Sequence, residues 1–237
     1  MNCMLIVHET MPDEASAVAE ALNTAYGIES LIEPISLDGV FTPILEFNAY
    51  DSSSINVAIA LRKFRAETGK RGMATLILTP RDLYMGDDRT QLSRDDDWAF
   101  AYNCGDFSVL SGARMKSDNG QPTDKLHVDK GLYLKRMAVM GVHEVAHDVV
   151  HGTHLLPAFW VNERSGHEMR LGSHCPDNTC ALYEVVDIKT PKLSEGHLRL
   201  GTEKKFDAGL DDVIQRLRPN YLCNDCRSSV KIDANYR

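Results

Sequence analysis

The sequence lacks both an excess of basic residues and any long apolar run. Its 237 residues hold 26 lysines and arginines against 34 aspartates and glutamates, a formal net charge of −8. This balance argues against bulk binding to nucleic acid or to an anionic membrane. No apolar run approaches the roughly 20 residues that a membrane-spanning helix needs. The N-terminal residues lack a basic leader and soon reach the acidic Glu9, so we expect a cytoplasmic protein.

Internal repeats, low-complexity tracts and flexible linkers are also missing from the sequence. The hydrophobic share of 43% and the charged share of 25% are those of an ordinary globular protein. Such a chain has enough apolar residues for a sizeable core, and its length suits one large domain or two small lobes. Composition does not indicate the oligomeric state.

The N-terminal part alternates strand and helix patterns. Strands are predicted at Met4–Glu9, Ile28–Ile35 and Met73–Thr79, and helices at Asp13–Tyr26 and Ser53–Thr68. In the second helix, Ile55, Ile59 and Phe64 are expected to face inward. Shorter strands are predicted at Trp98–Tyr102 and Phe107–Ser111, with loops at Ser36–Pro43 and Ser117–Asp124. The alternation predicts an α/β lobe with at least partly parallel strand pairing.

A helix predicted from about Lys130 carries the residues that we expect to organise the site. His143-Glu144-Val145-Ala146-His147 has the HExxH pattern of zinc peptidases. Histidines four positions apart lie on one face of a helix, so two neutral imidazoles can hold one zinc ion there. The intervening Glu144 can then accept a proton from a metal-activated water, as a general base.

Four of the six cysteines form two close pairs, and these predict a second metal site. The pairs are Cys175-x4-Cys180 and Cys223-x2-Cys226. In a chain without a recognisable secretion signal, such spacings favour metal binding over disulfides. Four thiolates match a tetrahedral structural zinc site. The remaining cysteines, Cys3 and Cys104, are expected to be buried small residues or free thiols.

Together these residues resemble the archaemetzincins, whose motif is HExxHxxGxxHCx4CxMx17CxxC. The matching parts are His143–His147, then His174-Cys175-x4-Cys180, then Cys223-x-x-Cys226. Upstream, Thr79-x-x-Asp82-Leu83-Tyr84 is similar to the family's TxxDLY segment. The resemblance implies a zincin-like mixed α/β fold and a zinc-dependent peptidase acting on peptides or proteins. It also implies one catalytic zinc and one structural zinc held by the four cysteines.

The sequence departs from the family's motif in two places. Residues 148–173 separate the second histidine from His174, where the motif has a much shorter segment, and Val150 stands at the motif's glycine. Leu182 stands at the motif's methionine, and the segment from there to Cys223 is also longer. The resemblance makes His174 the first choice for the third catalytic ligand, with His154 as the alternative. His151 would lie too far along the same helix to share one tetrahedral ion.

The resemblance implies one catalytic domain over residues 1–237. An α/β lobe with the active-site helix would occupy residues 1–150, and a C-terminal subdomain with the cysteine site residues 151–237. Within the subdomain, Leu155–Arg170 is interpreted as an inserted loop or lid, and Phe206–Leu217 as an amphipathic helix. The strand near Trp98–Tyr102 resembles the edge strand that would pair with an extended peptide.

Two other functions fit the same sequence. The altered motif positions and the insertions also suit a non-catalytic zinc protein that recognises peptides or acts as a scaffold. A plain α/β domain with one cysteine-held zinc and solvated histidines would bind a single zinc per chain. Dependence of peptide cleavage on Glu144 distinguishes the enzyme from both.

Overall fold

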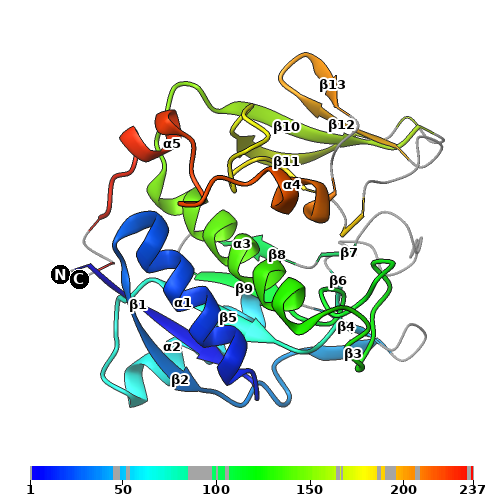
Figure 1. Cartoon of the computed structure of the whole chain (residues 1–237). Coiled ribbons are helices and arrows are strands. Elements are labelled where there is room, and N and C mark those ends of the chain that lie inside the picture. The colour runs from blue at the N-terminus through cyan, green and yellow to red at the C-terminus, as the bar shows by residue number, and fades with distance from the viewer. Residues whose placement is uncertain are drawn as a thin grey trace.

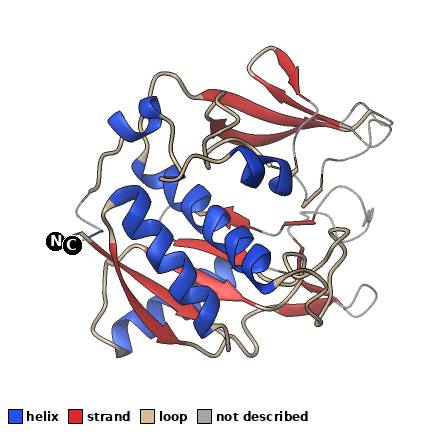
Figure 2. Ribbon diagram, viewed as in Figure 1, coloured by secondary structure: helices blue, strands red, loops and turns tan. Residues whose placement is uncertain are grey.

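The structure, a computed structural model, describes residues 2–44, 49–51, 54–84, 98–99, 101–104, 107–163, 166, 168–185, 188–189, 196–205, 209–233 and 236. Figure 2 shows the helices and strands within this part of the chain. The helices are α1 (Pro12–Tyr26), α2 (Ser54–Glu67), α3 (Lys130–Val149), α4 (Leu210–Arg216) and α5 (Asn224–Ser228). Among the described residues, no helix is both long enough and apolar enough to cross a membrane.

A five-stranded mixed sheet forms the base of the fold (Figure 1). Its strands, in spatial order, are β2 (Glu29–Pro34), β1 (Cys3–His8), β5 (Thr75–Thr79), β9 (Phe107–Ser111) and β8 (Ala101–Asn103). The first four pair in parallel, and β8 pairs antiparallel with β9 at the edge. Parallel neighbours need long crossover connections: α1 lies in the one from β1 to β2, and α2 lies in the one from β2 to β5. The predicted α/β class is therefore confirmed.

Helices cover both faces of this sheet. Met4 and Ile6 of β1 belong to an apolar cluster with buried residues of α1 and α3. Leu5 and Val7 belong to a second cluster, which includes Leu61 of α2. Side chains of a strand point alternately to the two faces, so α1 and α3 lie on one face and α2 on the other (Figure 1).

The predicted inward face of α2 was partly wrong. Ile59 is 61% exposed, whereas Leu61 is buried and Phe64 packs against the same cluster. The buried stripe continues to Arg65, whose Nε and Nη2 donate to Thr75 Oγ1 of the neighbouring strand. A helix of a globular protein buries one stripe, and here the stripe includes Leu61, Phe64 and Arg65 and leaves Ile59 outside it. The side chain of Ile55 lies outside what the structure describes.

Helix α3 runs from the sheet toward the C-terminal part of the chain (Figure 1). Asp129 caps its first turn, where Oδ1 accepts hydrogen bonds from Gly131 N at 2.7 Å and Leu132 N at 3.3 Å. Farther along, Tyr26 of α1 donates its hydroxyl hydrogen to the carbonyl of Val142 at 2.8 Å. The first contact fixes the start of α3. The second holds α3 against α1 at the residue just before His143.

The two segments that are longer than in the archaemetzincin motif, residues 148–173 and the stretch between Leu182 and Cys223, together form one antiparallel sheet. Its order is β11 (Glu168–His174), β10 (Leu156–Val161), β12 (His197–Leu200) and β13 (Glu203–Lys205). The first insertion supplies β10 and β11, and the second supplies β12 and β13. The interpretation of Leu155–Arg170 as a loop or lid was therefore wrong. Pro157 excludes a helix but is tolerated near the start of a strand.

A small sheet of short strands completes the described architecture. Its order is β3 (Thr42–Ile44), β4 (Ala49–Asp51), β6 (Leu83–Tyr84) and β7 (Trp98–Ala99). The last two residues of the loop predicted at Ser36–Pro43 therefore belong to β3. The helix predicted at Phe206–Leu217 begins at Leu210 in the structure, and residues 206–208 lie outside the described part of the chain.

Candidate metal centres

Helix α3 presents the first two histidines of the site. His143 and His147 lie one turn apart, with ring centroids separated by 5.0 Å. His143 is buried at 2% exposure, because α3 is covered by α1 on one side and by the loop after β11 on another. The HExxH segment is thus an interior part of the molecule, unlike a pair of solvated histidines on a surface helix.

The third imidazole comes from the C-terminal end of β11. The ring centroid of His174 lies 5.1 Å from that of His143 and 4.8 Å from that of His147. Its Nε2 is 3.2 Å from Nε2 of His143. One nitrogen from each ring lies within 4.8 Å of the other two. The structure thus brings together the three histidines that the sequence singled out first.

The path of β11 explains how His174 points inward. Gly172 has φ +107°, a conformation that favours glycine, and pairs with Ala158 just before an irregularity in the β10–β11 register. A Cβ atom added to Gly172 would lie 3.5 Å from Cε1 of His174 and 3.8 Å from Cε1 of His147, so the glycine is next to both rings. The glycine and the bulge together direct the end of the strand against α3.

Hydrogen bonding and burial prepare the rings for a cation. His143 Nδ1 donates to the carbonyl of Ala181 at 2.8 Å, which leaves its Nε2 lone pair facing the site. Burial lowers the pKa of His143, His147 and His174 to about 3 in each case. All three imidazoles are therefore neutral near pH 7, which is the form that binds metal.

Two buried carboxyl groups belong to the same region: Glu144 follows His143 on α3, and Glu184 contacts His174. Burial raises the pKa of Glu144 well above its usual range, and the nearby Glu184 and Asp148 raise it further. Burial also raises the pKa of Glu184 to about 7, against the opposing effect of His143. A divalent cation would allow both carboxyl groups to ionise while imidazole nitrogens bind it. The donor set therefore fits a zinc ion.

The paired cysteines also meet in the structure, beside the start of α5. Cys175 Sγ lies 3.6 Å from Cys223 Sγ, and the thiols of Cys180 and Cys226 are hydrogen-bonded within the same group. All four are buried free thiols. Bonds with Cys180 and Cys226 lower the pKa of Cys175 to about 5, whereas bonds with Cys180 and Cys175 raise the pKa of Cys226. Such a group of thiols suits tetrahedral zinc.

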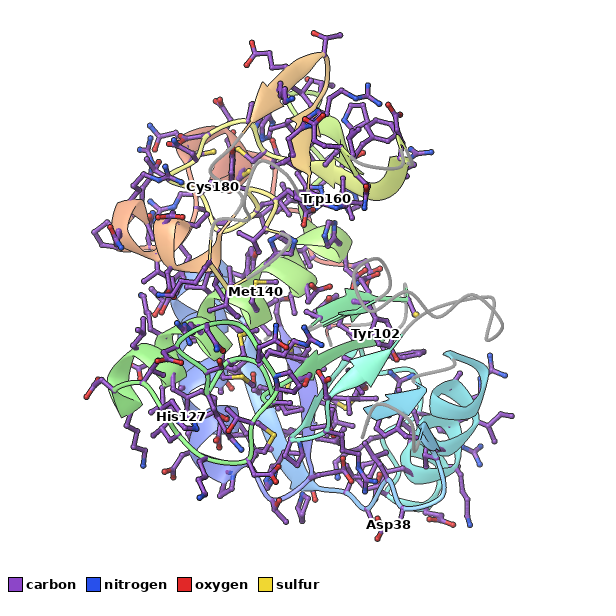
Figure 3. All side chains as sticks on the ribbon, turned by 90° about the vertical axis from the view of Figure 1, so that its right-hand side faces the viewer. Asp38, Tyr102, His127, Met140, Trp160 and Cys180 are labelled. Carbon is purple, nitrogen blue, oxygen red and sulfur yellow. The ribbon has the colours of Figure 1, made fainter. Side chains whose placement is uncertain are left out.

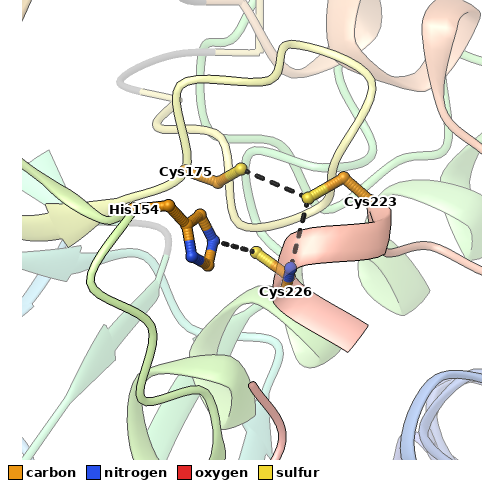
Figure 4. A group of neighbouring side chains, drawn as sticks. All are labelled: His154, Cys175, Cys223 and Cys226. Carbon is orange, nitrogen blue, oxygen red and sulfur yellow. Dashed lines mark hydrogen bonds between the residues drawn. The ribbon is translucent and has the colours of Figure 1, made fainter. Parts of the chain in front are cut away.

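His154 lies at the thiols and not with the other histidines (Figure 4). Its Nε2 is 3.2 Å from Sγ of Cys226, and its ligand atom lies within 4.8 Å of those of Cys175, Cys223 and Cys226. Gly152 permits this position, because a Cβ there would lie 2.2 Å from two ring atoms of His154. The structure thus assigns the two alternative histidines to different clusters.

The other histidines that the structure describes belong to neither cluster. His127 and His151 are exposed, and His197 Nδ1 is 2.7 Å from Glu163 Oε1. His167 lies outside the described residues. His8 Nδ1 accepts a hydrogen bond from Met11 N.

Sequence reasoning missed Glu184, and the only signal for it is its position two residues after Leu182. The spacing of residues along the chain does not indicate that the carboxylate of Glu184 contacts His174.

Comparison with solved structures identifies the fold. A zinc-dependent peptidase from Methanocorpusculum labreanum matches 96% of this chain and 98% of its own, with TM-score 0.57 and 18% identity. Archaemetzincin from Archaeoglobus fulgidus, complexed with malonate, matches 97% and 99%, with TM-score 0.52 and 16% identity.

The chain has an archaemetzincin-like fold. The archaemetzincin-like fold extends over nearly the whole chain, so it includes both histidine and thiol clusters. No protein-family model and no curated protein matches the sequence. At such low identity the similarity concerns the fold, and function has to be argued from the sites themselves.

Proposed function

We propose that this chain is a zinc-dependent peptidase, with His143, His147 and His174 as the ligands of its catalytic zinc. The observation that carries the proposal is the convergence of three neutral imidazoles, two of them buried, with the buried carboxyl group of Glu144 on the same helix turn as His143 and His147. A structural histidine cluster would not need a carboxylate on the same helix turn. A hydrolytic site does need one, to handle protons.

Glu144 acts as the general base of the proposed reaction. Zinc, when bound, polarises the scissile carbonyl and lowers the pKa of a water molecule. The carboxylate of Glu144 accepts a proton from the water and passes it to the nitrogen of the leaving amine. Burial raises the pKa of Glu144, and the nearby Glu184 and Asp148 raise it further, which favours holding the transferred proton.

The substrate of the proposed enzyme is an extended peptide or protein segment. Strand β8 is at the edge of the five-stranded sheet, so backbone groups of a peptide can extend that sheet. Asn103 at its end donates to the carbonyl of Glu144 at 3.2 Å and to Asp148 Oδ1 at 3.0 Å. A peptide paired with β8 would thereby be held in register with the base.

We further propose that Cys175, Cys180, Cys223 and Cys226 hold a second, structural zinc. Cysteine pairs that bind zinc are typical of a reducing compartment, so the proposed location is the cytoplasm. In this scheme residues 1–237 form one catalytic domain, with the α/β lobe in 1–150 and the cysteine site in 151–237.

Substitution of Glu144 tests the proposal. Glu144→Ala should retain two zinc ions per chain, because the residue is not a proposed ligand, and should reduce peptide turnover by about 100-fold or more. Turnover is measured as cleavage of a proteome-derived peptide library, and zinc by elemental analysis. Glu168→Gln, which removes an exposed carboxylate on β11, is the control. Cleavage that persists in Glu144→Ala would rule out the assigned role.

A non-catalytic zinc protein remains the second candidate, and one observation favours it. The carboxylate of Glu184 contacts His174 at the same nitrogen that faces His143. A group in that position competes with water for the metal. This candidate predicts two zinc ions in the wild-type chain and no Glu144-dependent cleavage in the library.

A further inference from the structure

Glu184 reaches the histidine site from the loop that follows Cys180. Its side chain is 8% exposed, and Oε2 is in contact with Nε2 of His174. The other oxygen, Oε1, accepts a hydrogen bond from the backbone N–H of Val185 at 3.0 Å. The carboxylate is therefore held by its own backbone, with one oxygen directed at the imidazole.

The nitrogen that Glu184 contacts is on the metal-facing side of the ring. His143 binds Ala181 through Nδ1, so its Nε2 faces the site, and Nε2 of His174 is 3.2 Å away. Two nitrogens bound to one tetrahedral zinc at 2.0–2.1 Å lie about 3.3 Å apart. The two nitrogens thus already have the spacing of a shared ion, and Oε2 of Glu184 contacts one of them, Nε2 of His174.

A carboxylate that merely oriented His174 would be found at the other ring nitrogen. Orienting groups bind the imidazole nitrogen that does not face the metal. That nitrogen, Nδ1 of His174, is buried and has no hydrogen-bond partner within the described part of the chain. Glu184 is instead on the opposite edge of the ring, where a ligand atom belongs.

We propose that Glu184 is a fourth protein ligand of the zinc at the histidine site, supplying a carboxylate oxygen beside three imidazole nitrogens. The inference rests on the proposed function, since it assumes a metal at those histidines. Charge supports it, because three neutral imidazoles leave the charge of a buried dication uncompensated, whereas a carboxylate halves it. With four protein ligands, a water or a substrate oxygen must enter as an additional ligand or displace the carboxylate.

Cobalt substitution tests the assignment independently of activity. The histidine site is loaded with Co²⁺ while zinc stays at the thiols, and the visible absorption of wild type, Glu184→Gln and Glu184→Ala is compared. Loss of a ligand should change the cobalt bands in both variants and weaken zinc binding at this site by at least about 10-fold in a chelator competition. Added acetate should restore the bands in Glu184→Ala, where the removed side chain leaves space.

The control is Glu168→Gln, which removes the same charge from β11, and it should leave the bands and the affinity unchanged. Thermal melts establish that each variant is folded. Unchanged cobalt bands in both Glu184 variants would overturn the proposal whatever the affinity. A wild-type chain that holds zinc at the thiols alone would instead refute the proposed function, so zinc per chain is measured first.

Discussion

At the scale of single residues, Arg136 shows how α3 is held in place. Its side chain has no exposure, although arginine is rarely buried without a partner. Nε and Nη2 each donate to Asp211 of α4 at 2.8 Å, and Nη1 donates to the carbonyls of Met115 and Ser117. The guanidinium therefore joins the helix that carries the histidines to two separate segments.

Replacement of Arg136 should destabilise the fold strongly. Arg136→Met leaves the carboxylate of Asp211 without its bidentate partner, which should lower the free energy of unfolding by about 3–5 kcal/mol. Urea unfolding followed by circular dichroism measures the change. Lys130→Met is the control, because the ion pair of Lys130 with Asp13 is exposed on the same helix. Equal stabilities of the two variants would contradict the structural role of Arg136.

His154 leads to a second prediction at this scale. A hydrogen bond from its ring to the sulfur of Cys226 should stabilise the thiolate that binds zinc. His154→Ala should therefore weaken zinc binding at the thiols by about 10-fold, measured by competition with a chromophoric chelator. Gly152→Ala should act in the same direction, because its methyl group would displace the ring. The exposed His151 provides the control, and an equal effect of His151→Ala would exclude a specific contact.

At the scale of elements, close packing of α1 against α3 positions the histidines. A Cβ at Gly141 would lie 2.6 Å from Cγ1 of Val18, so the two helices approach where α3 has no side chain. The approach occurs immediately before His143. A shift of α3 at this point would move the ring toward or away from Ala181.

Enlargement of Gly141 should separate the two helices. Alanine normally favours a helix over glycine by about 1 kcal/mol, but overpacking here should give a net loss of about 1–3 kcal/mol. Chemical unfolding of Gly141→Ala measures the loss. Val18→Ala removes the opposing methyl groups, so the double variant should recover part of it. A gain in stability in Gly141→Ala alone would show that the contact relaxes freely.

The sheet built from β10 to β13 is also an element-scale feature. The two departures from the archaemetzincin motif are far apart in sequence, yet their strands pair, with Ala158 opposite Leu200. The prediction of a lid failed because a strand with a proline at its start resembles a loop when its partners are unknown. The two insertions therefore form a single four-stranded sheet. In Figure 3, Trp160 and Cys180 are labelled above α3, and Tyr102 is labelled below it.

At the scale of the whole molecule, one loop links the two candidate metal sites. Cys180 belongs to the thiol group, Ala181 accepts the hydrogen bond of His143, and Glu184 contacts His174. Leu182 between them is completely buried, and its carbonyl accepts a hydrogen bond from Cys175 N at 2.9 Å. Folding of this loop around the thiols thus sets the position of groups at the histidines.

Loss of the thiol zinc should therefore weaken the histidine site. Cys223→Ser changes the N-cap of α5 and leaves the loop sequence intact, yet it should lower zinc affinity at the histidines by about 10-fold and reduce the melting temperature. Zinc stoichiometry after dialysis against a chelator, together with thermal melts, measures both effects. Cys3→Ser, in β1, is the control. Independent behaviour of the two sites in Cys223→Ser would show that the loop keeps its shape without metal.

The sequence by itself determined the features that depend on neighbouring residues. Histidines four positions apart share a helix face, apolar runs such as Thr75–Thr79 form buried strands, and close cysteine pairs can face one point. Only the tertiary structure decided which distant groups meet: His174 with the HExxH pair, His154 with the thiols, and Glu184 with His174. The physical reason is that local geometry follows from backbone periodicity, whereas these contacts depend on the path of the chain through β10 and β11 and through the loop that carries Cys180 and Glu184.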